Sequence, residues 1–159
     1  RIYNTHPTIA FSHLRFREYV EQGGVLITQY NTPYDLSVND VGTYPLTVSQ
    51  ERITDTESPI YFLDPTHRIL NYPNVIGQQD FRYWVQDRAL FLPKEWDADF
   101  EPILRSENSD GNHLDGLLLL RRKGKGFYIY SSLSLFRQLP AGVAGAYRLF
   151  ANILSLGSN

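Results

Sequence analysis

Apolar and polar residues follow one another along the chain in segments that predict helices packed against a sheet. Residues 6–24 predict a helix, because Pro7 suits a first helical turn and Gly23 suits a helical C-terminus. The segment 24–30 follows at once and is short, β-branched and apolar, as a strand buried on both faces is. A helix followed directly by a buried strand is half of a βαβ unit. The apolar positions of the helix have mostly helical spacing: Ile9, Ala10, Leu14, Tyr19 and Val20.

The chain is more polar between residues 31 and 58, where Asn, Asp, Pro, Thr and Ser are frequent. A long polar insertion of this kind is usually functional or mobile. Residues 58–65 then predict a short strand. Residues 77–91 predict a helix that ends before Pro93, with four side chains near one face: Phe81, Trp84, Val85 and Arg88.

The second half of the chain predicts a strand, a hairpin and a helix. Residues 100–107 are the strand, and two apolar runs in 117–133 flank the turn sequence RKGKG, which is typical of a β-hairpin. Residues 142–156 are apolar at helical spacing and predict the last helix. Together these elements predict an α/β fold. We also expect Arg1 to Asn4 to lie at the C-terminal tip of a strand that precedes the first helix.

Length and composition narrow the class of protein. The 159 residues suit one domain, and a net charge of −2 gives no electrostatic reason to bind nucleic acid or an anionic membrane. No apolar run reaches the roughly 18 residues of a membrane span. The absence of cysteine excludes disulfides and a thiolate nucleophile. Since methionine is absent too, we interpret the chain as a piece of something longer.

Familiar catalytic and cofactor patterns are weak in this sequence. The four histidines have no metal-ligand spacing, so we expect no metal site and no cofactor. The residues after the strand 24–30 lack the glycine-flanked elbow of a hydrolase nucleophile. The lysines and glycines of RKGKG lie between two strands, which favours a solvated turn over a phosphate site.

Polar residues at two strand ends are the strongest candidates for a ligand site. In open α/β sheets, ligands bind beyond the carboxyl ends of strands, where this sequence places Gln29 and Asn31 after one strand and Arg137 and Gln138 after another. The guanidinium of Arg137 suits a carboxylate or vicinal hydroxyls. The alternative is that Arg137 pairs with a structural carboxylate of the chain. The companions of Arg137 in a ligand site would be Arg88, Trp84 and Asp80. The structural carboxylate would be Asp80 or Asp87.

Four long segments resemble one known family. Residues 19–32, 52–74, 80–97 and 136–154 are similar to the glutamine-amidotransferase-like domain found C-terminal to PIG-L (LmbE-like) deacetylase domains in large bacterial proteins. The segment GKGFYIYSSLSLFRQ also resembles ThuA-like domains. The resemblance implies a flavodoxin-like three-layer α/β sandwich over residues 1–159, either as a single domain or as a C-terminal fragment that lacks its N-terminal strands. It also implies an upstream zinc-dependent deacetylase of N-acetyl sugars, and an exported, periplasmic or extracellular protein.

The chain departs from that family where catalysis would occur. Glutamine amidotransferases carry a cysteine after the strand that here ends at Tyr30, and a histidine after the strand that here is 127–131. This chain has neither, so we expect a non-catalytic accessory domain that binds a polar small molecule or sugar. Two alternatives stay open: a purely structural or protein-interaction module, and a divergent hydrolase without a Cys-His dyad. An incomplete sheet would expose an edge strand, which makes a homodimer a further hypothesis.

Overall fold

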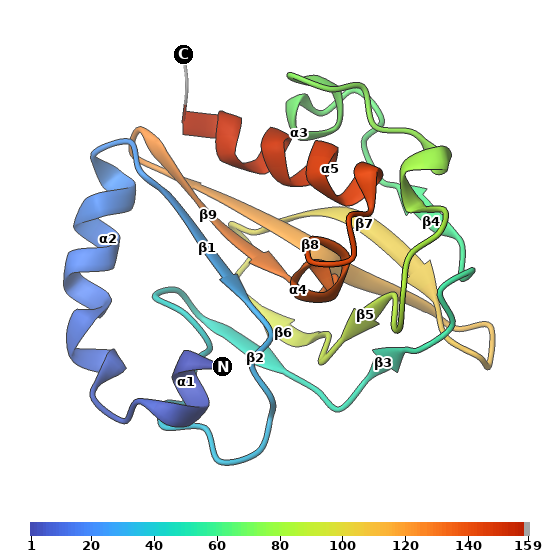
Figure 1. The fold of residues 1–159 in the computed structure, drawn as a ribbon. Helices are drawn as coiled ribbons and strands as arrows, with labels where there is room; N and C mark the ends of the chain where they lie inside the picture. Colours follow the sequence, from blue (N-terminus) through green and yellow to red (C-terminus); the bar gives the residue numbers. More distant parts are fainter. Residues whose placement is uncertain (158–159) are drawn as a thin grey trace.

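A five-stranded mixed sheet forms the centre of the computed structural model, which describes residues 1–157 (Figure 1). The strand order is β1-β9-β8-β7-β4. Only β1 and β9 run parallel, and the other neighbouring pairs are antiparallel. The strands are β1 (Val25–Gln29), β4 (Ile60–Phe62), β7 (Glu101–Glu107), β8 (His113–Lys123) and β9 (Gly126–Ser131).

Each face of the sheet carries its own apolar core. Ile129 and Leu120 belong to one core, which also contains side chains of α5 (Ala144–Leu154) and α3 (Arg68–Asn71). Tyr128 and Leu119 belong to the other core, which lies toward α1 (Ile2–Thr5), α2 (His13–Glu21) and β2 (Leu46–Val48). Neighbouring residues of one strand enter different cores because side chains alternate across a strand. Figure 1 shows α5 crossing one face of the sheet, with α2 beside β1.

Short elements complete the chain. Strand β2 pairs with β6 (Pro93–Trp96), and β3 (Arg52–Ile53) pairs with β5 (Ala89–Leu90), both antiparallel. Turns of 3-10 helix lie at η1 (Ile9–Ser12), η2 (Gln78–Phe81) and η3 (Ser155–Gly157), and α4 is a single turn at Leu135–Gln138.

The structure confirms several predicted elements. The strands expected at 24–30 and 100–107 correspond to β1 and β7, and the last predicted helix corresponds to α5. The hairpin is β8 and β9, whose final register pair joins Lys123 to Gly126. Gly124 has a φ of 59°, which is the left-handed region that the turn requires and that glycine adopts at low cost. The coarse prediction of an α/β fold is therefore confirmed.

The structure differs from the predictions in three segments. The helix expected over 77–91 is only the turn η2, after which Tyr83, Gln86 and Asp87 take positive φ values and lead the chain into β5. The polar segment 31–58, for which the sequence predicts no element, contains β2 and β3. The start of the chain forms α1 instead of a strand end, and the helix expected from residue 6 has its regular α-helical turns only from His13.

Candidate functional site

Asn31, which follows β1, forms a hydrogen bond with the start of the chain. Asn31 is only 1% exposed, and its Oδ1 accepts a hydrogen bond of 3.2 Å from the backbone N–H of Tyr3. Its Nδ2 donates to the carbonyl oxygen of Gln29 at 3.3 Å. Gln29 and Asn31 both line a cavity of about 250 Å³ beside β1. The Oε1 of Gln29 is buried and has no hydrogen-bond partner within residues 1–157.

Tyr30 occupies the point at which β1 ends, in a conformation that is uncommon for a residue with a side chain. Its φ is 49°, in the left-handed region. The ring lies 4.3 Å from the ring of Phe136 and 5.9 Å from that of Phe91, both measured between centroids. The guanidinium of Arg52 lies 4.9 Å from the Phe91 ring. Aromatic rings therefore cover the strand end. The sequence reading missed this cluster, because Phe91 lies far from Phe136 along the chain.

Arg137 pairs with Asp87, one of the two carboxylates considered as its partner. The distance from Nη2 to Oδ2 of Asp87 is 3.4 Å. Nη1 donates to Oε1 of Gln86, and the guanidinium lies 5.4 Å from the ring of Phe136. The side chain is 31% exposed, and its Nε is buried without a hydrogen-bond partner in the described part of the chain. Arg137 thus holds the turn at residues 86–87 against the end of β9.

Gln138 is fully buried and clamps the same turn from inside. Its Oε1 accepts from the backbone N–H of Val85 at 2.7 Å, and its Nε2 donates to the carbonyl oxygen of Val85 at 2.6 Å. Nε2 also donates to Oγ of Ser134 at 3.0 Å. A side-chain amide that bonds both the N–H and the C=O of one residue replaces the backbone partners that an irregular turn lacks.

Arg88 is a buried cation whose hydrogen bonds all go to backbone carbonyls. It is 3% exposed, and it donates to Ser58 O from Nε at 3.2 Å and from Nη2 at 3.0 Å. Nη1 donates to Phe81 O at 2.6 Å, and the guanidinium lies 5.5 Å from the Trp84 ring. Burial lowers the pKa of Arg88, and the carboxylates of Glu57 and Asp55 partly oppose that shift.

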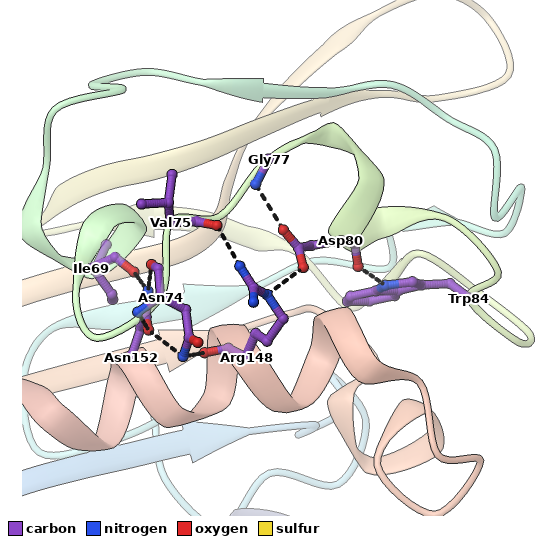
Figure 2. Close-up of polar contacts among 8 residues, drawn as sticks. All are labelled: Ile69, Asn74, Val75, Gly77, Asp80, Trp84, Arg148 and Asn152. Atoms are coloured by element: carbon purple, nitrogen blue, oxygen red, sulfur yellow. Dashed lines mark hydrogen bonds and ion pairs between the residues drawn. The ribbon is translucent and has the colours of Figure 1, made fainter.

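Asp80 connects η2 to α5 (Figure 2). Its Oδ1 accepts from Nε of Arg148 at 2.8 Å, and its Oδ2 accepts from the backbone N–H of Gly77 at 2.8 Å. Its carbonyl oxygen accepts from Nε1 of Trp84 at 3.0 Å. Trp84 is buried, with its ring 5.6 Å from that of Phe81. Asp80 therefore pairs with Arg148 and not with Arg137.

A second buried amide holds the neighbouring loop on α5. Asn152 donates from Nδ2 to Ile69 O at 2.9 Å and to Asn74 O at 2.7 Å. Its Oδ1 accepts from the backbone N–H of Asn74 at 2.9 Å, and Figure 2 shows these bonds beside the Asp80 and Arg148 pair. The sequence offers a signal for this role, since an Asn on the apolar face of a helix must find partners when it is buried.

The seven predicted site residues fall into two groups in the structure. Gln29 and Asn31 lie at the end of β1. Of the other five, three belong to the segment 80–88, and two contact it from α4. Their contacts in the described structure are with the protein itself, so ligand binding by these residues stays a prediction. The two groups are Gln29 and Asn31, and then Asp80, Trp84, Arg88, Arg137 and Gln138.

The described residues offer neither a metal-binding cluster nor a membrane-spanning helix. Within residues 1–157, no three His, Asp or Glu side chains gather closely enough to hold a metal ion. The helices in the same range are too short or too polar to cross a bilayer.

The fold places the chain in the class of mixed α/β proteins with a central sheet. One solved structure, described as Cytoplasmic Protein STM3548 from Salmonella typhimurium, matches with a TM-score of 0.54 and 15% sequence identity. The match covers 91% of this chain and 59% of that chain, so this chain spans well under two thirds of that neighbour. At this identity the likeness shows a shared fold alone. No family model matches the sequence, and neither does a curated protein.

Proposed function

We propose that this chain is a non-catalytic accessory domain of a larger protein, and that its strand-end residues stabilise the fold rather than bind a substrate. The observation that carries the proposal is the end of β1. Tyr30 ends β1 with a left-handed backbone, with φ at 49°, and its side chain is a ring packed 4.3 Å from the ring of Phe136. A phenol stacked in this way is a poor substitute for the thiolate that the family carries there.

The family assignment belongs to the same proposal. A parallel β1–β9 pair with helices on both faces of the sheet supports a flavodoxin-like, glutamine-amidotransferase-like origin. That origin would make a PIG-L-type sugar deacetylase the domain that this chain accompanies. A homodimer through β1, one of the two edge strands of the described sheet, is part of the same hypothesis, and sedimentation of the purified chain tests it.

An activity panel tests whether the domain is non-catalytic. The purified chain is assayed against glutamine, simple esters and N-acetyl amino sugars, beside Tyr30→Phe and Asp87→Asn variants. We expect no turnover above the uncatalysed rate for any protein. Turnover by the wild type that either variant abolishes would contradict the proposal and support a divergent hydrolase.

One observation favours a second candidate, the binding of a polar ligand at the strand ends. The Nε of Arg137 is buried without a partner in the described residues, although the side chain is 31% exposed. A small shift of this side chain would present the guanidinium to a sugar or a carboxylate. Titration with amino sugars separates this candidate from the first, as described at the end of the Discussion.

A further inference from the structure

A second cavity, of about 300 Å³, lies between α2 and the loop of residues 38–45. None of the seven residues predicted for the strand-end site lines it. Its volume is near the lower end of the range for small-molecule sites, roughly 300–1,000 Å³. His13 and Arg17 contribute from α2, where a spacing of four residues puts both side chains on one face of the helix. The loop contributes Asp40 and Tyr44 from the opposite wall.

Hydrogen bonds fix the two walls relative to each other. The hydroxyl of Thr43 donates to the carbonyl oxygen of His13 at 2.9 Å. The Nε of Arg17 donates to Thr43 O at 2.8 Å. Farther along the loop, the hydroxyl of Tyr128 donates to Val41 O at 3.1 Å. The cavity is therefore shaped before any ligand arrives, which reduces the entropy lost on binding.

Several polar groups of this cavity are unused within residues 1–157. Tyr44 is 5% exposed, yet its hydroxyl has no hydrogen-bond partner there, and neither has the buried Nε2 of His13. Arg17 makes no ion pair with the described carboxylates, and its side-chain hydrogen bonds within residues 1–157 use Nε alone. Its guanidinium lies 5.8 Å from the centroid of the Tyr44 ring. Asp40 uses Oδ1 to accept from the backbone N–H of Leu46 at 3.2 Å. A buried hydroxyl without a partner is costly, so a ligand oxygen that accepts from it would remove a cost that the described chain leaves in place.

The charges select the chemistry of the ligand. Arg17 offers a fork of N–H donors suited to a carboxylate, and Asp40 on the other wall offers an acceptor suited to a hydroxyl. The pKa of His13 is lowered by burial and by Arg17, with an opposing effect of Asp40, so its ring adds no positive charge at neutral pH. One cation and one carboxylate together fit a monoanion that also carries a hydrogen-bond donor.

We infer that this cavity binds a small hydroxy acid, with Arg17 and Tyr44 holding its carboxylate and Asp40 accepting from its hydroxyl. This inference does not depend on the proposed function, because an accessory domain and a free-standing one could both use the site. The ligand would supply the partner that the Tyr44 hydroxyl lacks. It would also give the free N–H groups of Arg17 a charged acceptor.

The test is a titration of the purified chain followed through its backbone amide resonances. Four probes are compared: glycerate, propionate without the hydroxyls, glycerol without the carboxylate, and inorganic phosphate. We expect saturable shifts from glycerate, centred on residues 10–17 and 38–45, and weaker binding of the other three. Tyr44→Phe should weaken glycerate binding by roughly tenfold, the loss expected for a hydrogen bond to a charged group.

Matched variants keep the result interpretable. Tyr44→Phe removes one oxygen that has no partner in the described chain, so its melting temperature should stay the same or rise. Arg17→Gln should also weaken glycerate binding, whereas Arg15→Gln, an exposed arginine on the same helix, should not. Equal affinity of the wild type and Tyr44→Phe, tighter binding of phosphate than of glycerate, or no saturation with any probe would each overturn the inference.

Discussion

Gln138 shows how one side chain holds an irregular turn in place. It bonds both the N–H and the C=O of Val85, next to Gln86 and Asp87, whose φ values are 39° and 40°. Left-handed conformations are unfavourable for residues with a Cβ and persist only where the surroundings fix them. Gln138 and Arg137 together supply those surroundings.

The variant Gln138→Glu tests that role while keeping the shape of the side chain. Glutamate can still accept from Val85 N–H, but it cannot donate to Val85 O or to Ser134 Oγ. We expect the free energy of unfolding at pH 7 to fall by about 2–3 kcal/mol, because buried acceptors lose their partner and gain a negative neighbour. Urea unfolding measures the change, with the exposed Gln50→Glu as control. An unchanged midpoint would show that the turn does not depend on this amide.

Asp97 contributes to the stability of the folded state in a way that depends on pH, and the sign follows from the direction of its pKa shift. A hydrogen bond from the backbone N–H of Asp99, and then one from Arg121, lower the pKa of Asp97 below its usual value of 3.8. Because the folded pKa lies below the unfolded one, the ionised carboxylate favours folding above about pH 4. That contribution is lost as the pH falls through the folded pKa.

Asp97→Asn should therefore be less stable than the wild type at pH 7, and the two proteins should converge as the pH falls below 4. Thermal unfolding at pH 7, 5 and 3 measures the difference. The exposed Asp110→Asn is the control, since its carboxylate makes no hydrogen bond or ion pair within residues 1–157. A difference that grows toward low pH would reverse the assigned sign.

At the scale of elements, α5 approaches η2 so closely that one position must be glycine. A Cβ on Gly145 would lie 1.9 Å from the carbonyl oxygen of Asp80 and 2.4 Å from its carbonyl carbon. These are backbone atoms that Arg148 and Trp84 also hold in place through Asp80. The contact cannot relax by a rotation of a side chain.

Gly145→Ala should destabilise the fold, although alanine is normally the better helix former by about 1 kcal/mol. Forcing α5 away from η2 costs roughly 1–3 kcal/mol, as overpacking does elsewhere. Chemical unfolding gives the sign directly. The exposed neighbour Ala144→Gly should cost only its helix propensity. A more stable Gly145→Ala protein would contradict the close approach.

Elements with strong local signals could be predicted from the sequence, and those held by distant contacts could not. The hairpin β8–β9 has its own turn glycine, and α5 has helical spacing of apolar residues, so both were predictable. The segment 77–91 also has helical spacing, but Gln138, Arg137 and Ser58 bind its backbone or side chains in a non-helical path. Those partners lie up to about fifty residues away, beyond any local pattern.

The same reasoning applies to the candidate site. Sequence order placed Arg137 and Gln138 beyond a strand and correctly considered Asp87 as a partner for Arg137. It could not show that the rings of Tyr30, Phe91 and Phe136 meet, because the three residues lie in segments that are far apart along the chain.

At the scale of the whole molecule, the sheet separates two cores and two kinds of polar site. Arg137 and Gln138 make most of their polar contacts with the turn at residues 85–87. In the cavity beside α2, the Tyr44 hydroxyl and the Nε2 of His13 have no hydrogen-bond partner within residues 1–157. From the contacts of Arg137 and Gln138 we propose that this strand end braces the fold and does not bind a substrate.

Arg137→Ala tests this claim most directly when stability and binding are measured on the same samples. Melting temperatures and calorimetric titrations with glucosamine, N-acetylglucosamine and a chito-oligosaccharide are compared for the wild type and the variant. We expect a lower melting temperature for Arg137→Ala, by a few degrees, and the same absence of saturable sugar binding in both proteins. Saturable binding to the wild type that Arg137→Ala abolishes, with an unchanged melting temperature, would contradict it.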